Sequence, residues 1–181
     1  MPARVSPGTW RTNGPLAAAF ARAAGRATGT VPPAVFTVLG RGRRTFWGWL
    51  GFAATLMPFG SLPRRDSELV ILRVAQRRGS AYEAAHHRRI GRRAGLTGEQ
   101  VDAILRAAPD PTVFSARQQV LLAATDELLA TDDLSDATWA SLGEQLDERG
   151  CVEFLLLVGH YRMLATAFTA LRVEPDAARG R

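Results

Sequence analysis

The sequence predicts an all-α fold built from a single domain. Hydrophobic residues make up 46% of the 181 residues and charged residues 22%, a globular composition in a chain long enough to bury a core. Apolar residues recur at helical spacing, capping residues and glycines separate these stretches, and none has the alternation of a strand. We therefore expect a flexible tail over residues 1–14 and one helical domain over residues 15–175.

The first part of this domain is expected to hold three helices. Pro15 suits an early helical position, where its missing N–H costs nothing, so a helix is predicted over residues 15–25. A linker over residues 28–33 then leads to a short helix over residues 35–40. The third helix is predicted over residues 45–57.

Aromatic side chains are concentrated in and just after this third helix: Phe46, Trp47, Trp49, Phe52 and Phe59. The simplest interpretation is that they belong to the hydrophobic core. The alternative is a hydrophobic wall or lid over a substrate pocket. A membrane span is not expected, because the apolar stretch is shorter than the roughly 20 residues required.

The central helix is predicted over residues 63–78. It is apolar over most of its circumference, so we expect it to be surrounded by the others. Gly79 ends it, and the next helix covers residues 81–94 before a glycine stop at Gly95. The remaining helices begin after capping residues or a glycine, and are predicted after Thr97 and over residues 116–130, 136–148 and 150–171.

Four polar residues flank the turn between these two central helices: Glu68, Ser80, Glu83 and His87. Glu83 and His87 lie one helical turn apart and are expected to point into the bundle. Glu68 lies on an apolar face, where a buried carboxylate needs a partner. His87 is its natural candidate.

Such a cluster is suited to general acid/base chemistry, because nearby carboxylates favour the imidazolium form while burial opposes it. A structural interpretation is also open. Ser80-x-x-Glu83 has the pattern of a helix capping box, and Glu68 can pair with Arg64 or Arg65 one turn earlier.

A metal site is a further alternative. Glu83, His86 and His87 supply ligand side chains on one helix, and Glu68 or His160 could join them. The HExxH motif is absent and no second helix repeats the pattern, so we expect neither metal nor other cofactor. His86 is expected to be exposed or at an interface, and His160 in the core or at an interface.

Composition limits the partners. All basic residues are arginine, which excludes lysine Schiff-base chemistry and a P-loop lysine. The net charge is +6, but the aromatic–basic interleaving and zinc-finger spacing of nucleic-acid binders are missing, so no nucleic acid is expected. Cys151 is the only cysteine and is expected to be an inert buried thiol. Without a disulfide or a secretory signal, a cytoplasmic location is expected.

The segment ELVILRVAQRRGSAYEAAHH resembles the carboxymuconolactone decarboxylase and alkylhydroperoxidase D-like (AhpD-like) family. The resemblance covers roughly residues 62–105 well and residues 47–171 more loosely. In the peroxidase branch, eleven residues separate a glutamate from a Cys-x-x-Cys pair, and three separate that pair from a histidine. Glu68 and His87 match the outer residues, whereas Ser80 and Glu83 stand in place of the cysteines.

The resemblance implies an AhpD-like helical bundle that assembles into homo-oligomers (dimers, trimers or hexamers). Dithiol peroxidase activity is not expected, because attack on peroxide needs a thiolate and a second thiol to resolve the sulfenic acid. The branch without the dithiol implies a cofactor-free, decarboxylase-like lyase for a small carboxylic acid or lactone. The alternative is a non-catalytic oligomeric scaffold protein of the same fold.

In the enzymatic hypothesis, His87 donates a proton to the carbanion left by CO₂ and Glu68 orients it, while Glu83 carries a second proton. Ser80 and Tyr82 are expected to hydrogen-bond the substrate. Arg73 is a candidate to receive a substrate carboxylate.

Overall fold

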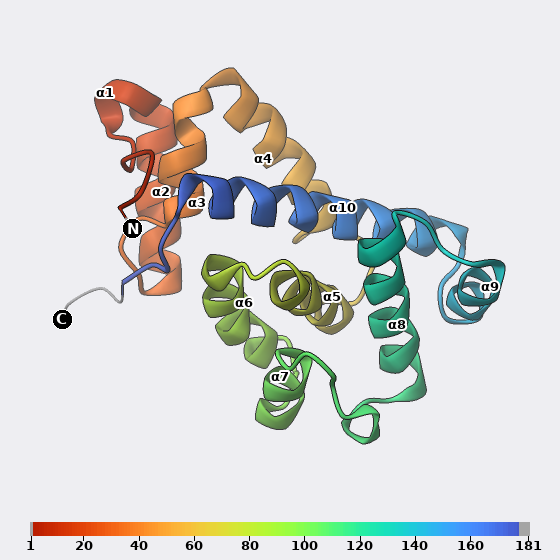
Figure 1. The fold of residues 1–181 in the computed structure, drawn as a ribbon. Coiled ribbons are helices and arrows are strands. Elements are labelled where there is room, and N and C mark those ends of the chain that lie inside the picture. The colour runs from red at the N-terminus through yellow and green to blue at the C-terminus, as the bar shows by residue number, and fades with distance from the viewer. Residues whose placement is uncertain (1, 178–181) are drawn as a thin grey trace.

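The computed structural model describes residues 2–177, and its regular elements are helices, as predicted (Figure 1). In chain order they are α1 (Trp10–Asn13), α2 (Pro15–Thr28), α3 (Ala34–Leu39), the 3-10 turn η1 (Gly40–Gly42), α4 (Arg44–Leu56), α5 (Arg64–Arg77), α6 (Ala81–Arg93), α7 (Gly98–Ile104), the 3-10 turn η2 (Pro111–Val113), α8 (Ala116–Thr131), α9 (Asp136–Gln145) and α10 (Glu148–Leu171).

Helix α5 lies at the centre of the larger group of helices. All ten residues from Asp66 to Ala75 are buried, as expected for a helix that is apolar over most of its circumference. It packs against α6, α8 and α10. Figure 1 shows α10 running above α5, with α6 and α8 on either side of it.

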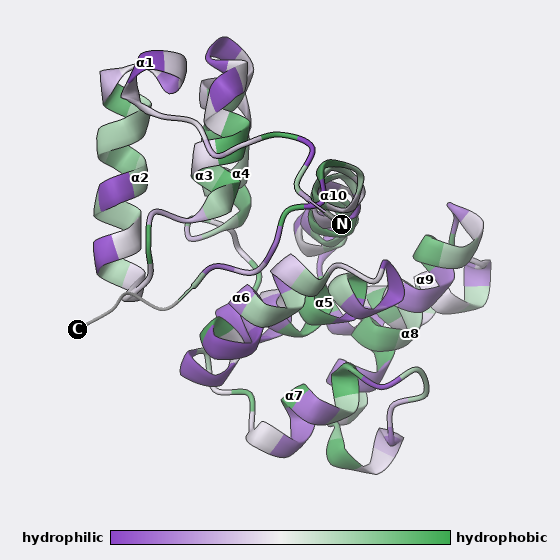
Figure 2. Ribbon diagram, turned by 60° about the vertical axis from the view of Figure 1, so that its left-hand side comes forward, coloured by the Kyte–Doolittle hydropathy of each residue, from purple (hydrophilic) through white to green (hydrophobic). Residues whose placement is uncertain are grey.

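A second group, formed by α1 to α4, stands beside one end of α10 (Figures 1 and 2). Within α4 only Phe46 and Leu56 are buried, while Trp47 is 43% and Phe52 is 40% exposed. The expectation that the aromatic residues of this region form core is therefore wrong for Trp47, Phe52 and Phe59, whereas Phe46 is buried and Trp49 packs against the core. Helix α4 instead presents an apolar wall, whose hydrophobic colouring is visible in Figure 2.

The N-terminal segment differs from the flexible tail that the sequence predicts; Met1 lies outside the described residues. The segment contains α1, and the backbone N–H of Gly8 donates to the carbonyl of Thr37 over 2.9 Å. The side chain of Asn13 is buried and donates to the same carbonyl over 2.8 Å. These bonds join positions far apart in sequence, so local periodicity does not predict them.

Two glycines bring α5 and α6 together. Gly79 has a φ of 64°, a left-handed conformation that lets the chain reverse between the helices. Gly91 is buried on α6, and a Cβ atom there would lie 3.2 Å from Leu72 on α5. Because Gly91 has no side chain, α6 lies close against α5, and His87 one turn earlier is brought next to α5.

Helix α10 is long and apolar enough to cross a membrane by length and composition, with a mean hydropathy of 1.4 over its best window. In this fold it is a core helix that packs against α4, α5, α8 and α9. It begins two residues earlier than predicted, because Asp147 caps it by accepting the N–H of Gly150 over 2.7 Å. Helix α9 correspondingly ends at Gln145.

Candidate acid/base site

Glu68 and His87 meet between α5 and α6, as the spacing predicts. The Nδ1 atom of His87 lies 2.7 Å from Oε2 of Glu68, and both side chains are buried. Arg64, one turn before Glu68, places a guanidinium nitrogen 2.9 Å from the other carboxylate oxygen. The carboxylate therefore has a charged neighbour at each oxygen, which offsets the cost of burying its charge, although Oε1 makes no hydrogen bond within residues 2–177.

This pairing also orients the ring of His87. With a carboxylate at Nδ1, that nitrogen carries the proton and donates it to Glu68, which leaves the lone pair of the neutral ring on Nε2. No hydrogen bond within residues 2–177 involves Nε2, and His87 lines a cavity. The ring can therefore accept a proton at Nε2 while Glu68 stabilises the positive charge that results.

Glu83, one turn before His87, is in a different state. It is only 2% exposed, and neither carboxyl oxygen has a hydrogen-bond partner among the described residues. Burial raises the pKa of Glu83 to about 8, although the nearby hydroxyl of Ser80 acts in the opposite direction. Glu83 is therefore a protonated carboxylic acid near neutral pH.

The capping-box interpretation of Ser80 and Glu83 is wrong. Ser80 is the N-cap of α6, but its side chain accepts no capping hydrogen bond, and its Oγ atom is buried without a partner within residues 2–177. Ser80 is buried behind the cavity wall and is not one of the residues that line the cavity.

The cavity beside His87 has a volume of about 670 Å³. Most of its lining comes from α3, α4, α6 and α10, with one residue each from α2 and α5, and most of the lining side chains are apolar. Helix α4 supplies one wall, with Trp47, Trp49, Leu50, Gly51, Ala53 and Ala54. This finding fits the alternative interpretation of the aromatic helix as a wall over a pocket.

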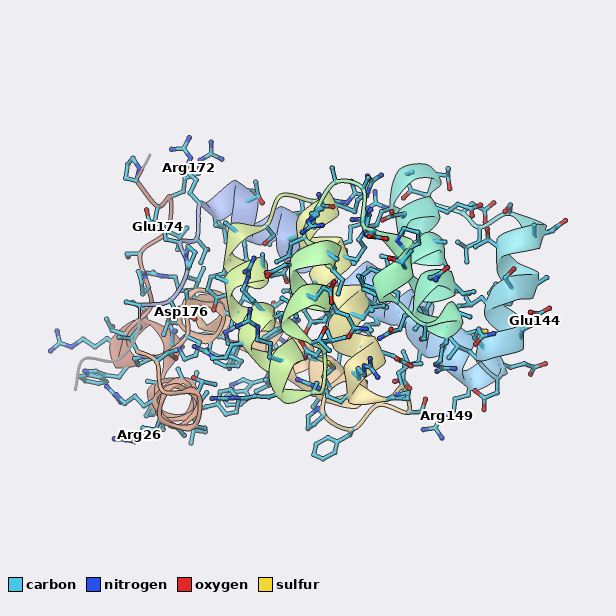
Figure 3. The ribbon with its side chains drawn as sticks, turned by 90° about the horizontal axis from the view of Figure 1, so that it is seen from below. Arg26, Glu144, Arg149, Arg172, Glu174 and Asp176 are labelled. Carbon is cyan, nitrogen blue, oxygen red and sulfur yellow. The ribbon has the colours of Figure 1, made fainter. Side chains whose placement is uncertain are left out.

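Tyr82 also lines the cavity, but its hydroxyl already has two partners. The hydroxyl accepts the N–H of Val35 over 3.0 Å and donates to Oδ2 of Asp176 over 2.9 Å. Oδ1 of Asp176 accepts the N–H of Ala34 over 2.8 Å. Tyr82 and Asp176 thus hold α3 against α6, and Figure 3 labels Asp176 on the C-terminal segment. Burial and the charge of Asp176 raise the pKa of Tyr82.

Arg73 is not one of the residues that line the cavity. Its side chain is buried, its Nε atom donates to Asp126 over 2.6 Å, and its guanidinium also donates to the carbonyls of Ile104 and Arg106. The expectation that Arg73 receives a substrate carboxylate is wrong. Its role is to join α5 to α8 and to the end of α7.

Three cavity residues were not assigned to the site by sequence reasoning. His86 is half-buried and stacks parallel to Tyr82, and burial lowers its pKa to about 4. His160 and Tyr161 reach the cavity from α10, where both are buried. In the sequence, His160 and Tyr161 appear only as a polar pair within an otherwise apolar helix. This pattern does not show which face of α10 borders the cavity.

No group of three or more histidine, cysteine, aspartate or glutamate side chains within residues 2–177 is arranged to hold a metal. Cys151 is buried in the first turn of α10 and is not among the cavity-lining residues. Burial raises the pKa of its thiol, with the charge of Asp147 acting in the same direction.

Comparison with known proteins shows which family model and which solved structures the chain resembles. Residues 43–127 match the carboxymuconolactone decarboxylase family. No curated protein matches the sequence significantly. An AhpD-core, peroxidase-related protein from Ralstonia eutropha JMP134 superposes with a TM-score of 0.83 at 15% identity, over 97% of this chain and 93% of that one.

Two further structures share this fold. A peroxidase-related protein from Silicibacter sp. TM1040 has a TM-score of 0.79 at 16% identity, over 96% of this chain and 89% of its own. A variant of the debrominase Bmp8, solved in complex with 2,3,4-tribromopyrrole, has a TM-score of 0.80 at 14% identity, over 98% and 95%. At these identities the similarity establishes the fold alone.

The family match contains both Glu68 and His87, and the shared fold extends over nearly the whole described chain. Cys151 is the only cysteine, so the sequence has no Cys-x-x-Cys pair. Residues 43–127 of this chain thus match the carboxymuconolactone decarboxylase family, the chain has the AhpD-like helical fold, and its sequence lacks a Cys-x-x-Cys dithiol.

Proposed function

We propose that this protein is a cofactor-free acid/base enzyme, a decarboxylase-like lyase for a small lactone or carboxylic acid in the cytoplasm. One observation carries the proposal. His87, held at Nδ1 by the buried carboxylate of Glu68, lines a cavity of about 670 Å³, large enough for a small metabolite. The catalytic roles of His87, Glu68 and Glu83 follow from it.

The geometry supports proton transfer at Nε2 of His87. In a decarboxylation, the bond to the carboxylate carbon breaks, CO₂ leaves, and the electron pair passes to a conjugated carbonyl as an enolate. His87, having taken up a proton from solvent at Nε2, then delivers that proton to carbon, while Glu68 stabilises the ring in its charged form. Glu83, which is protonated near neutral pH, is a second source of the proton.

The charges around the cavity favour a substrate with a single negative charge, that of the carboxylate to be lost. Among the described lining residues Arg64 is the one arginine, and it is already paired with Glu68. Burial lowers the pKa of His86 and His160 to about 4, so both are neutral near pH 7. A lactone ring therefore suits the cavity better than a dianion. The tribromopyrrole complex of Bmp8 supports a ligand of one small ring.

Dithiol peroxidase chemistry is not proposed. Ser80 and Glu83 have no thiol, and Cys151 lies away from the cavity with a raised pKa, which opposes thiolate formation.

The test is a screen of one-ring lactones and carboxylic acids for turnover, followed by His87→Gln. We expect this variant to lose about 10²- to 10⁴-fold in kcat, the usual contribution of a general acid or base. His86→Gln is the matched control, since His86 lies in the same helix and cavity without a carboxylate partner. Equal turnover by wild type and His87→Gln would remove His87 from the mechanism.

The non-catalytic scaffold is the second candidate, because apolar side chains are exposed on one face of α10. Val152 is 56%, Leu156 is 47% and Met163 is 51% exposed, and their spacing puts them on the same face. We propose that this face takes part in self-association into a dimer, trimer or hexamer, with or without catalysis. Light scattering on Leu156→Glu measures this directly, and an unchanged mass would exclude the face.

A further inference from the structure

His160 occupies a second position in the cavity, on α10 and away from the α5–α6 corner. Its side chain is 5% exposed and lies among aromatic rings. The imidazole is parallel to the indole of Trp49, with an interplanar angle of 8° and centroids 6.2 Å apart, and it meets the edge of Phe52 at 5.4 Å.

The polar atoms of this aromatic region lack partners. Nδ1 of His160 and Nε1 of Trp49 are both buried without a hydrogen bond to any described residue. Nε2 of His160 also makes no hydrogen bond within residues 2–177, but it is not sealed from solvent as Nδ1 is. Because buried polar groups in native proteins are almost always hydrogen-bonded, the protein leaves the hydrogen-bonding capacity of this region unmet, and Nε2 of His160 is the atom that a ligand in the cavity can reach.

The chemistry of His160 differs from that of His87. Burial alone lowers the pKa of His160 to about 4, and no carboxylate holds its ring. A neutral imidazole carries one N–H and one lone pair, and without a protein partner the ligand decides which nitrogen is the donor. Trp49 can only donate. This region therefore suits an uncharged hydrogen-bond acceptor such as a carbonyl oxygen.

Tyr161 connects the two histidines. Its ring centroid lies 5.1 Å from that of His87 and 5.2 Å from that of His160, and it is nearly perpendicular to both. A flat molecule of one or two fused rings that covers Tyr161 therefore reaches both imidazoles.

We propose that His160 is a specificity-determining residue that hydrogen-bonds the ring carbonyl oxygen of a small cyclic ester or ketone bearing the one carboxylate that is lost as CO₂, with Nε2 of His87 at the other end of the same ring. This inference rests on the proposed function and deepens it, because it names the substrate class and the residue that selects it. His160 then stabilises negative charge that develops on that oxygen as the enolate forms.

The experiment compares phthalide, a fused-ring lactone, with phthalan, the same ring system without the carbonyl. Affinities for both are measured by isothermal titration calorimetry on wild type, His160→Phe, His160→Gln and His87→Gln. We expect wild type to prefer phthalide by about tenfold, the contribution of one good hydrogen bond. His160→Phe keeps the ring packing and should bring the ratio to about one by weakening phthalide alone. His160→Gln, with its amide N–H, should restore part of the preference.

Phthalan is the internal control, since unchanged phthalan affinity shows that the cavity of each variant is intact. His87→Gln should retain the preference for phthalide, which separates this inference from the proposed function, because binding is measured without turnover. A phthalide preference that survives in His160→Phe overturns the inference, as does a wild type that binds phthalide no better than phthalan or binds neither.

Discussion

The two buried histidines of the cavity differ in the groups that contact their rings. His87, between α5 and α6, has a carboxylate 2.7 Å from Nδ1, and that carboxylate is itself paired with Arg64. His160, on α10, has aromatic rings around it, and its Nδ1 has no partner within the described chain. Both side chains are about equally buried, at 6% and 5% exposed.

Burial therefore does not decide what a histidine can do; its nearest partner does. A carboxylate stabilises the positive charge that an imidazole acquires when it takes up a proton, so His87 can change its charge during a reaction. An imidazole in an aromatic environment is kept neutral, so His160 can only donate or accept a hydrogen bond.

The strongest test of this comparison removes the carboxylate. Glu68→Ala should lower the free energy of unfolding by about 3–5 kcal/mol, because it leaves a gap and unpaired partners in a buried ion pair. Chemical denaturation measures the change. Glu144→Ala, at an exposed position of α9 (labelled in Figure 3), is the control and should change stability by less than about 0.5 kcal/mol. A loss of similar size in both variants would contradict the importance of the pair.

The next test concerns the second acid. The pKa of Glu83 is raised to about 8 in the folded state from an ordinary value of 4.5, so the unfolded chain loses this proton first as pH rises. Glu83 therefore costs stability progressively between about pH 4.5 and pH 8. Glu83→Gln should be more stable than wild type at pH 8 by up to about 4 kcal/mol and nearly equal at pH 4.5. A difference that does not depend on pH would mean that Glu83 is not protonated in the fold.

His160 gives the opposite pH dependence. Its folded-state pKa of about 4 lies below the ordinary 6.5, so the unfolded chain binds the proton first as pH falls. Stability is therefore lost between about pH 6.5 and pH 4, and His160→Phe should remove about 2 kcal/mol of that loss. Thermal unfolding at pH 7 and pH 4.5 measures this loss of stability in wild type and in His160→Phe, and His87→Phe is measured for comparison. Equal pH dependence in wild type and His160→Phe would show that His160 is not kept neutral.

The smallest expected effect concerns helix α3, which contributes Val35 and Phe36 to the lining of the same cavity. Asp176→Ala removes the acceptor for Tyr82 and for the N–H of Ala34, and should cost about 1 kcal/mol. Hydrogen exchange of the Ala34 and Val35 amides should speed up, whereas Glu174→Ala in the same segment should leave it unchanged. Unaltered exchange in Asp176→Ala would show that the C-terminal segment does not hold α3.

Local spacing was sufficient to predict the helices from α2 onward and one half of the site. The apolar circumference of the central helix predicted that α5 is buried, and the requirement that a buried carboxylate have a partner predicted that Glu68 meets His87. Both predictions use side chains within about one helix pair of each other, where the helical period fixes direction.

The other half of the site was decided only by tertiary structure. The helical period shows which residues of α4 and α10 share a face, but not which distant helix covers that face or leaves it open. The aromatic wall of α4, the position of His160 and Tyr161 in the cavity, and the bond from Asp176 to Tyr82 all depend on how remote helices pack. The sequence by itself thus determined the helices from α2 onward and the acid–histidine pair, while the packing of α3, α4 and α10 decided the cavity in which that pair can act.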